Sequence, residues 1–127
     1  MTRVKSWVKL PAQISYEWVS GGYFLLHWVD VSMGDTKIEV IEVIGSYDSA
    51  DDSYAMRSFD NDGNFITMKG RFERDGAFKI EGDGMRSTLT YNQFQQSMTI
   101  SWERLQDGSF WKPWLNMKLS KLTAHIQ

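Results

Sequence analysis

The sequence predicts an all-β fold, an antiparallel up-and-down β-barrel of about ten strands. Apolar and polar residues alternate with a period of two, which is typical of strands with one buried face. Turn residues interrupt this alternation at roughly the eight-to-twelve-residue spacing of sandwiches and barrels. A long meander with one apolar face buries that face and removes its edges most simply by closing on itself. A closed barrel is therefore favoured over an open sandwich.

Length and composition predict one domain over residues 1–127. The chain has 127 residues, of which 42% are hydrophobic and 14% aromatic, with a formal net charge of -2. This is enough apolar material for a single core, and too much for a chain that is disordered by composition.

The alternation indicates ten strands, separated by turns in which glycine, aspartate and asparagine supply the positive φ angles of tight hairpins. The expected strands are Arg3 to Leu10, Ile14 to Val19, Tyr23 to Val31, Lys37 to Gly45, Tyr54 to Phe59, Asn64 to Arg74, Ala77 to Glu81, Met85 to Tyr91, Ser97 to Leu105 and Phe110 to Leu119. Short connections between them imply that neighbouring strands pair antiparallel.

Residues at positions i and i+2 of a strand share a face, so the alternation also predicts which side chains lie inside. In the second half of the chain the inner face comprises Ile66, Met68, Phe72, Phe78, Ile80, Met85, Leu89, Tyr91, Met98, Ile100, Trp102, Trp111, Leu115, Met117 and Leu119.

Two strands are apolar on both faces, Tyr23 to Val31 and Lys37 to Gly45. A strand of this kind needs cover on both sides. The cover is either the N-terminal segment of the chain or a second subunit, because large exposed apolar patches are uncommon on monomers. The second alternative predicts a homodimer that buries Phe24, Leu26 or Trp28, or else Tyr23 and Leu25 if the parity is reversed.

Composition excludes several classes of function. A sequence pI near 5.6 leaves no basic field for the phosphates of nucleic acid. No apolar run has the roughly 20 residues of a membrane helix, and Met1 to Leu10 lacks the apolar core of a secretory signal. The absence of cysteine is compatible with a cytoplasmic protein. No dinucleotide, phosphate-loop or nucleophile-elbow motif is present, so we expect no cofactor.

We also expect no metal site. His27 and His125 are the only histidines, so the usual nitrogen and sulfur ligands of zinc are missing. The window from Ser58 to Lys69 imitates a calcium-binding loop, but Ser58 and Lys69 stand where that loop needs carboxylates. We interpret it as a hairpin turn.

The candidate ligand-binding residues are polar groups set among apolar ones. His27 shares a face with Leu25 and Val29, and Glu42 shares a face with Val40 and Ile44. If both point inward they lie on adjoining strands, where a histidine and a carboxylate can act as a general base or orient a polar ligand group. The alternative is a structural role on the outer face or in an interface.

Three further residues are candidate contacts to a ligand. The planar guanidinium of Arg57 could hold a carboxylate, although an exposed strand position is the commoner role of an arginine. Met68 and Trp102 belong to a methionine-rich and tryptophan-rich inner face that suits an adaptable apolar pocket. The same residues would equally fill the core of a ten-stranded barrel.

Several segments together carry a family resemblance. They are Tyr16 to Leu25, Val43 to Asp48, Phe59 to Gly63, Trp102 to Arg104, Asp107-Gly108 and Trp111 to Trp114. From about Tyr16 to Leu122 the chain resembles the bacterial domain-of-unknown-function family 1579. The resemblance implies a lipocalin-like (calycin) barrel and carries no catalytic residues. Members begin with a longer segment than Met1 to Ser15, so we expect the first strand to be shortened, replaced or supplied by a partner.

Three functions remain open at the level of sequence. The first is a module that binds a small hydrophobic molecule inside the barrel. The second is an enzyme that moves a proton on a small apolar substrate through His27 and Glu42, and the third is a homo-oligomerisation domain. A cavity with these two residues on its wall favours the first two functions, and a filled barrel favours the third.

Overall fold

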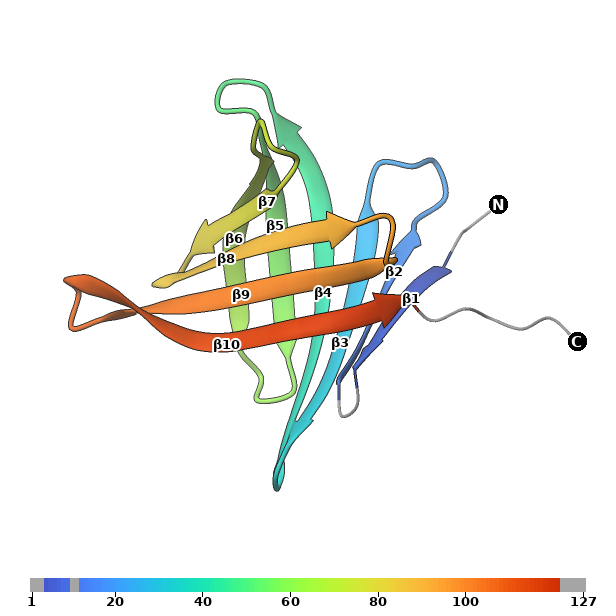
Figure 1. Ribbon diagram of the computed structural model, residues 1–127. Helices are drawn as coiled ribbons and strands as arrows, with labels where there is room; N and C mark the ends of the chain where they lie inside the picture. Colours follow the sequence, from blue (N-terminus) through green and yellow to red (C-terminus); the bar gives the residue numbers. More distant parts are fainter. Residues whose placement is uncertain (1–3, 10–11, 122–127) are drawn as a thin grey trace, which may run out of the picture.

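The computed structural model describes residues 4–9 and 12–121, which form strands and turns without a helix (Figure 1). The strands are β1 (Val4–Lys9), β2 (Ala12–Trp18), β3 (Leu25–Met33), β4 (Thr36–Asp48), β5 (Ser53–Asp60), β6 (Phe65–Phe72), β7 (Phe78–Gly82), β8 (Met85–Asn92), β9 (Ser97–Gln106) and β10 (Phe110–Lys121). In the described part of the chain, no helix is long and apolar enough to cross a membrane.

Each strand pairs antiparallel with the next one along the chain, and β1 closes the barrel against β10. The closing contact is short, with Trp7 opposite Lys121 and Val8 opposite Ser120. The predicted antiparallel up-and-down barrel is confirmed. The strand β1 is part of the barrel wall, between β2 and β10, so it does not lie over the outside of β3 and β4.

The turn between β5 and β6 is the predicted hairpin turn. The Asp60 carboxylate accepts hydrogen bonds from the backbone N–H groups of Asp62 and Asn64, each at 2.9 Å, and from the Asn64 side chain. These bonds hold the pKa of Asp60 below its usual range. The acidic residues here therefore serve the backbone of the turn.

Two clusters of buried side chains fill parts of the barrel interior. One contains Ile14, Met98, Ile100 and Leu119, and the other contains Met56, Met68 and Ile80. Apart from Phe72, the predicted inward positions on β6, β7 and β9 lie in these clusters or pack against them. Phe72 and Tyr91 have the inward parity but lie at strand ends, where they are exposed.

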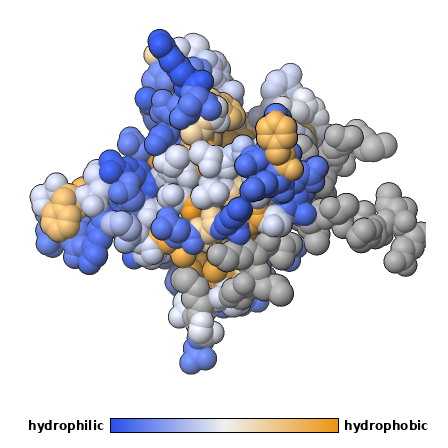
Figure 2. Space-filling model, viewed as in Figure 1, coloured by the Kyte–Doolittle hydropathy of each residue, from blue (hydrophilic) through white to orange (hydrophobic). Residues whose placement is uncertain are grey.

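The prediction that Trp111 lies inside is wrong. Between Pro113 and Leu115 the register of β10 against β9 shifts. Because such a bulge inserts one residue, it reverses the inside and outside parity of the strand. Trp111 consequently lies opposite Leu105, and the guanidinium of Arg86 stacks 4.2 Å from its ring on the outer surface. The outer surface over β8, β9 and β10 is mostly hydrophilic (Figure 2).

Gly70 leaves space inside the barrel for its neighbours. A Cβ atom at this position would stand 2.3 Å from the Phe78 ring and 2.8 Å from the sulfur of Met56. Both distances are far below van der Waals contact, so a larger residue would have to displace the second core cluster.

We predict that Gly70→Ala lowers the free energy of unfolding by about 1–3 kcal/mol, the usual cost of overpacking a core. Equilibrium denaturation in urea measures this change. The double variant Gly70→Ala with Phe78→Leu should recover part of the loss, because the shorter side chain withdraws from the added methyl group. Equal stability of Gly70→Ala and the wild type would show that the Phe78 ring does not need this space.

Candidate functional site

A cavity of about 620 Å³ lies inside the barrel. Most of its wall is aliphatic or aromatic, with Val29, Val40, Ile66, Leu89 and Met117 among the lining residues. It extends to the end of the barrel that carries the β5–β6 and β7–β8 turns, where Asn61 and Asp83 line it. Lipid-like and drug-sized molecules occupy cavities of this size and character.

A row of polar side chains crosses one wall of this cavity. Strand register places Tyr16 opposite His27, His27 opposite Glu42, and Glu42 opposite Ser58. The four residues therefore come from β2, β3, β4 and β5 at one level of the barrel. All four line the cavity.

Glu42 is the centre of the row, and its side chain is only 7% exposed. Its two carboxylate oxygens have different partners. The Ser58 hydroxyl donates to Oε2 at 2.6 Å, and His27 Nδ1 donates to Oε1 at 3.2 Å. A buried carboxylate is tolerated when hydrogen bonds replace its lost hydration, and these two neighbours supply one to each oxygen.

His27 is held by a face contact as well as by the hydrogen bond. Its ring stacks on that of Tyr16 with centroids 4.2 Å apart and planes 6° apart. Because Nδ1 donates to the carboxylate, Nε2 of the neutral ring is an acceptor. This Nε2 atom is buried and has no hydrogen-bond partner among the described residues.

The arrangement supports hydrogen bonding or proton transfer at Nε2. Ser58 directs its hydroxyl to Glu42, so the trio lacks the serine-to-histidine hydrogen bond that activates a nucleophile. A histidine oriented by a carboxylate is instead a base, or a polar anchor, whose reactive nitrogen is the one away from the carboxylate.

The Glu42 carboxylate also affects the ionisation of Tyr16. Burial of its hydroxyl and the nearby charge of Glu42 raise the pKa of Tyr16 above its ordinary range. The phenol is therefore neutral throughout the physiological range of pH, and it contributes a flat apolar surface with a protonated hydroxyl to the cavity.

The structure brings together four of the five predicted site residues. His27 and Glu42 face inward on adjoining strands, and Met68 and Trp102 line the same cavity. Arg57 is a half-buried residue of the outer face, because its neighbours Met56 and Ser58 in β5 point inward. The sheet itself separates Arg57 from the cavity, so the geometry does not support its interpretation as a ligand contact.

Sequence reasoning missed Tyr16 and Ser58 as members of the polar row, and Arg104 at the cavity end. The Arg104 guanidinium stacks 3.6 Å from the Trp114 ring, and both residues line the cavity. Arg104 could have been found in the sequence, because it follows Trp102 by two residues and therefore shares the inward face of β9. His125 lies outside the described residues, and among the residues that the structure describes no three histidine, aspartate or glutamate side chains gather as a metal site.

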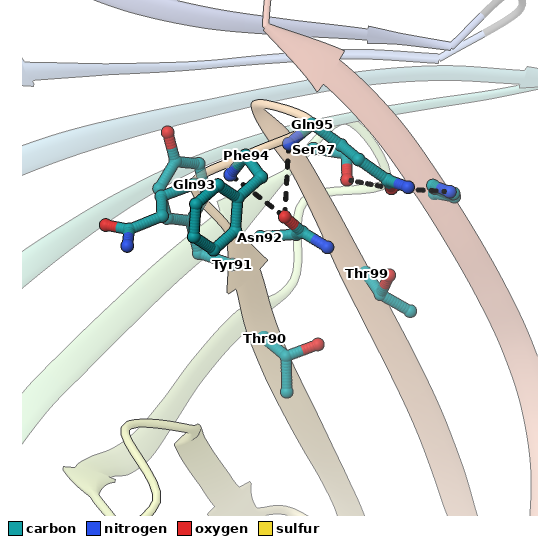
Figure 3. A pocket seen from close by; sticks show the side chains of 9 residues that line it. Thr90, Tyr91, Asn92, Gln93, Phe94, Gln95, Ser97 and Thr99 are labelled. Atoms are coloured by element: carbon teal, nitrogen blue, oxygen red, sulfur yellow. Dashed lines mark hydrogen bonds between the residues drawn. The ribbon is translucent and has the colours of Figure 1, made fainter.

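A second hollow lies at the β8–β9 turn and differs in character (Figure 3). Its polar groups bond to one another: Asn92 Oδ1 accepts the backbone N–H groups of Phe94 and Gln95, and Gln95 Oε1 accepts from Ser97 and Lys118. With these groups satisfied locally, the barrel cavity is the better candidate site.

No protein-family model and no curated protein matches the chain. The resemblance to family 1579 stays a prediction.

We predict that Ser58→Ala destabilises the protein by about 1–3 kcal/mol, because it removes a donor from a buried carboxylate. The matched control is Ser87→Ala. Ser87 is also buried in the barrel, but its hydroxyl has no hydrogen-bond partner among the described residues, so its removal should cost little. Urea denaturation of both variants measures the difference. Similar losses for the two would contradict a special role of the bond to Glu42.

We also predict that stability falls at alkaline pH through Tyr16. The folded state raises the pKa of this phenol, so it binds the proton more tightly than the unfolded chain, in which the pKa is about 10. The resulting stability is fully present below about pH 10 and is lost as the pH rises above it. Denaturation midpoints measured across this range should fall less steeply for Tyr16→Phe than for the wild type. The exposed Tyr23→Phe is the control, and an unchanged slope in Tyr16→Phe would contradict the assignment.

Proposed function

We propose that the protein binds a small, mostly apolar molecule inside the barrel, with one polar group of that molecule hydrogen-bonded to Nε2 of His27. The volume and the apolar wall of the cavity support the binding of such a molecule. Met68 and Trp102 provide an adaptable apolar surface, and the hydrogen bond to His27 fixes the orientation of the bound molecule.

The buried Nε2 atom is the observation that carries this proposal. A buried polar atom without a partner costs about 1–3 kcal/mol. Nε2 has almost no accessible surface, so a ligand hydroxyl reaches it only after neighbouring side chains move. The hydroxyl then removes this cost, and it does so only in one orientation of the ligand. The site therefore gains both affinity and a defined binding direction from one atom.

The charge of Glu42 favours a neutral polar group over a carboxylate. A ligand group at Nε2 lies across one imidazole ring from the Glu42 carboxylate, in surroundings of low polarity. Like charges at such a separation repel more strongly than they do in water. An alcohol or a similar uncharged donor is therefore the ligand class that fits best.

The same free nitrogen favours a second candidate function, proton transfer on a bound apolar substrate. His27 would accept the proton at Nε2, and Glu42 would stabilise the imidazolium through Nδ1. Native mass spectrometry of protein from its host identifies a bound molecule by its mass, and NMR spectra of that molecule before and after incubation with the protein separate the two functions. A molecule recovered unchanged after incubation supports binding, and a molecule recovered as an isomer supports proton transfer.

We predict that the neutral dye Nile red binds saturably and quenches tryptophan emission, and that decanol displaces it better than decanoate. His27→Ala should weaken decanol binding by about 0.5–1.5 kcal/mol, the net worth of one hydrogen bond, while decane displaces the dye equally from both proteins. Fluorescence titration measures all three ligands.

Two further variants control this experiment. His27→Gln retains a donor for Glu42, so it tests the ligand contact in a protein whose buried carboxylate keeps a partner. Leu26→Ala changes the neighbouring outward residue on β3 and should leave decanol binding unchanged. Absence of saturable binding by any probe would overturn the proposed function, and equal decanol binding by His27→Ala would overturn the role of His27.

A further inference from the structure

The outer face of β3 to β6 carries a continuous row of exposed apolar side chains. Strand register places Trp28 opposite Ile41, Ile41 opposite Phe59, and Phe59 opposite Phe65. Their exposed fractions are 37%, 46%, 48% and 59%, so each retains a large accessible surface. The Phe59 and Phe65 rings also stack, with centroids 5.0 Å apart. We call these four residues the outer row.

Half-buried Leu26 and Val43 extend the apolar area on one side of the outer row. The described N-terminal strand offers it no cover, because β1 lies in the wall beyond β2. A patch that spans four strands is larger than the scattered apolar residues of an ordinary monomer surface, and it marks an interaction site.

The charges beside the outer row differ between its two sides. On one side lie Asp30 and Glu39, which are opposite each other across β3 and β4 and are both exposed. On the other side lies Arg57, next to Val43 in the register. Within the described residues, Arg57 has no ion pair with an acidic side chain. The first side also carries Lys37, which pairs with Glu39 at 3.0 Å, and the second also carries Glu17, which lies opposite Leu26 on β2. The patch thus keeps a net acidic charge along one edge, while Arg57 places a local positive charge on the other.

We propose that the outer row binds a second copy of this chain, through a two-fold axis that runs along the row. This axis exchanges the two edges of the patch, so Arg57 of each copy faces the Asp30 and Glu39 edge of the other. An axis parallel to the strands would instead place the acidic edges against each other. Charge complementarity therefore selects both the partner and the arrangement.

Such an interface has the properties of an isologous dimer contact. The same residues serve both copies, as a two-fold axis requires. The strands of the two sheets run nearly parallel to each other, as in aligned sheet packing. Ile41 and Phe59 lie at its centre, and Trp28 at one end of the row adds a second large aromatic side chain of the kind that dominates interface energy.

Sedimentation velocity over a range of protein concentrations tests the proposal. We expect a reversible dimer in the wild type. Trp28→Glu should give a monomer, and Arg57→Glu should raise the dimer dissociation constant at least about tenfold, because each interface then contains two repulsive contacts. Combining Arg57→Glu with Glu39→Arg restores opposite charges at both contacts, so the double variant should regain most of the wild-type affinity.

Phe94→Ser is the matched control, because Phe94 is 91% exposed and lies at the β8–β9 turn, away from the outer row. It should remain dimeric. Far-ultraviolet circular dichroism of each variant shows whether the barrel is intact, and the charge-swapped double variant tests the contact even if Trp28→Glu unfolds. A wild type that is monomeric at every concentration, or a dimer that none of the outer-face variants weakens, would overturn the proposal. Loss of affinity in Arg57→Glu without recovery in the double variant would overturn the two-fold arrangement.

Discussion

The burial of one carboxylate constrains the rest of this barrel. Removing an ionised group from water is costly unless hydrogen bonds and a countercharge compensate it. Glu42 obtains two hydrogen bonds from the strands on either side, one from Ser58 of β5 and one from His27 of β3. The stacking of Tyr16 then fixes the histidine ring. Four strands must therefore keep their mutual register for the carboxylate to remain tolerable, and the polar wall of the cavity follows from that requirement.

The sequence predicted those parts of the site that depend on alternation alone. The parity of β3 and β4 places His27 and Glu42 inside, and their short hairpin makes them neighbours. The partnership of Glu42 with Ser58 could not be predicted in the same way. An irregularity between Gly45 and Asp48 shifts the register of β4 against β5, so partners cannot be counted outward from the turn.

The error at Trp111 has the same physical origin. Alternation fixes faces only as far as the next bulge, and nothing in the sequence around Pro113 specifies on which side the extra residue is accommodated. Arg57 shows a different limit. Its parity was available from Met56, but a half-buried cation on an apolar surface is understood only once the neighbouring strands are placed beside it.

The wall formed by β3, β4 and β5 is inverted at one level, with polar side chains inside and apolar ones outside. Trp28, Ile41 and Phe59 occupy the outer positions directly after or before the inner His27, Glu42 and Ser58. The polar inner row and the apolar outer row both depart from the usual pattern, and each presents groups without a partner to another molecule. The inner row offers a hydrogen-bond acceptor to a small ligand, and the outer row offers apolar area to a macromolecule.

This inversion makes correct pairing during folding depend on the turns. A slip of β4 by one residue would bury Ile41 and expose Glu42. At this level of the barrel, the burial of apolar surface alone would therefore favour the wrong alignment. The opposing signals are local. Gly34 adopts a φ of 60° in the β3–β4 turn, and the Asn61 amide accepts from the backbone N–H of Glu39 and donates to the carbonyl of Lys37. The Gly34 turn and the Asn61 side chain at the barrel rim thus favour the correct alignment of the strands. A chain that lost them would form misaligned intermediates and fold slowly, rather than simply lose stability.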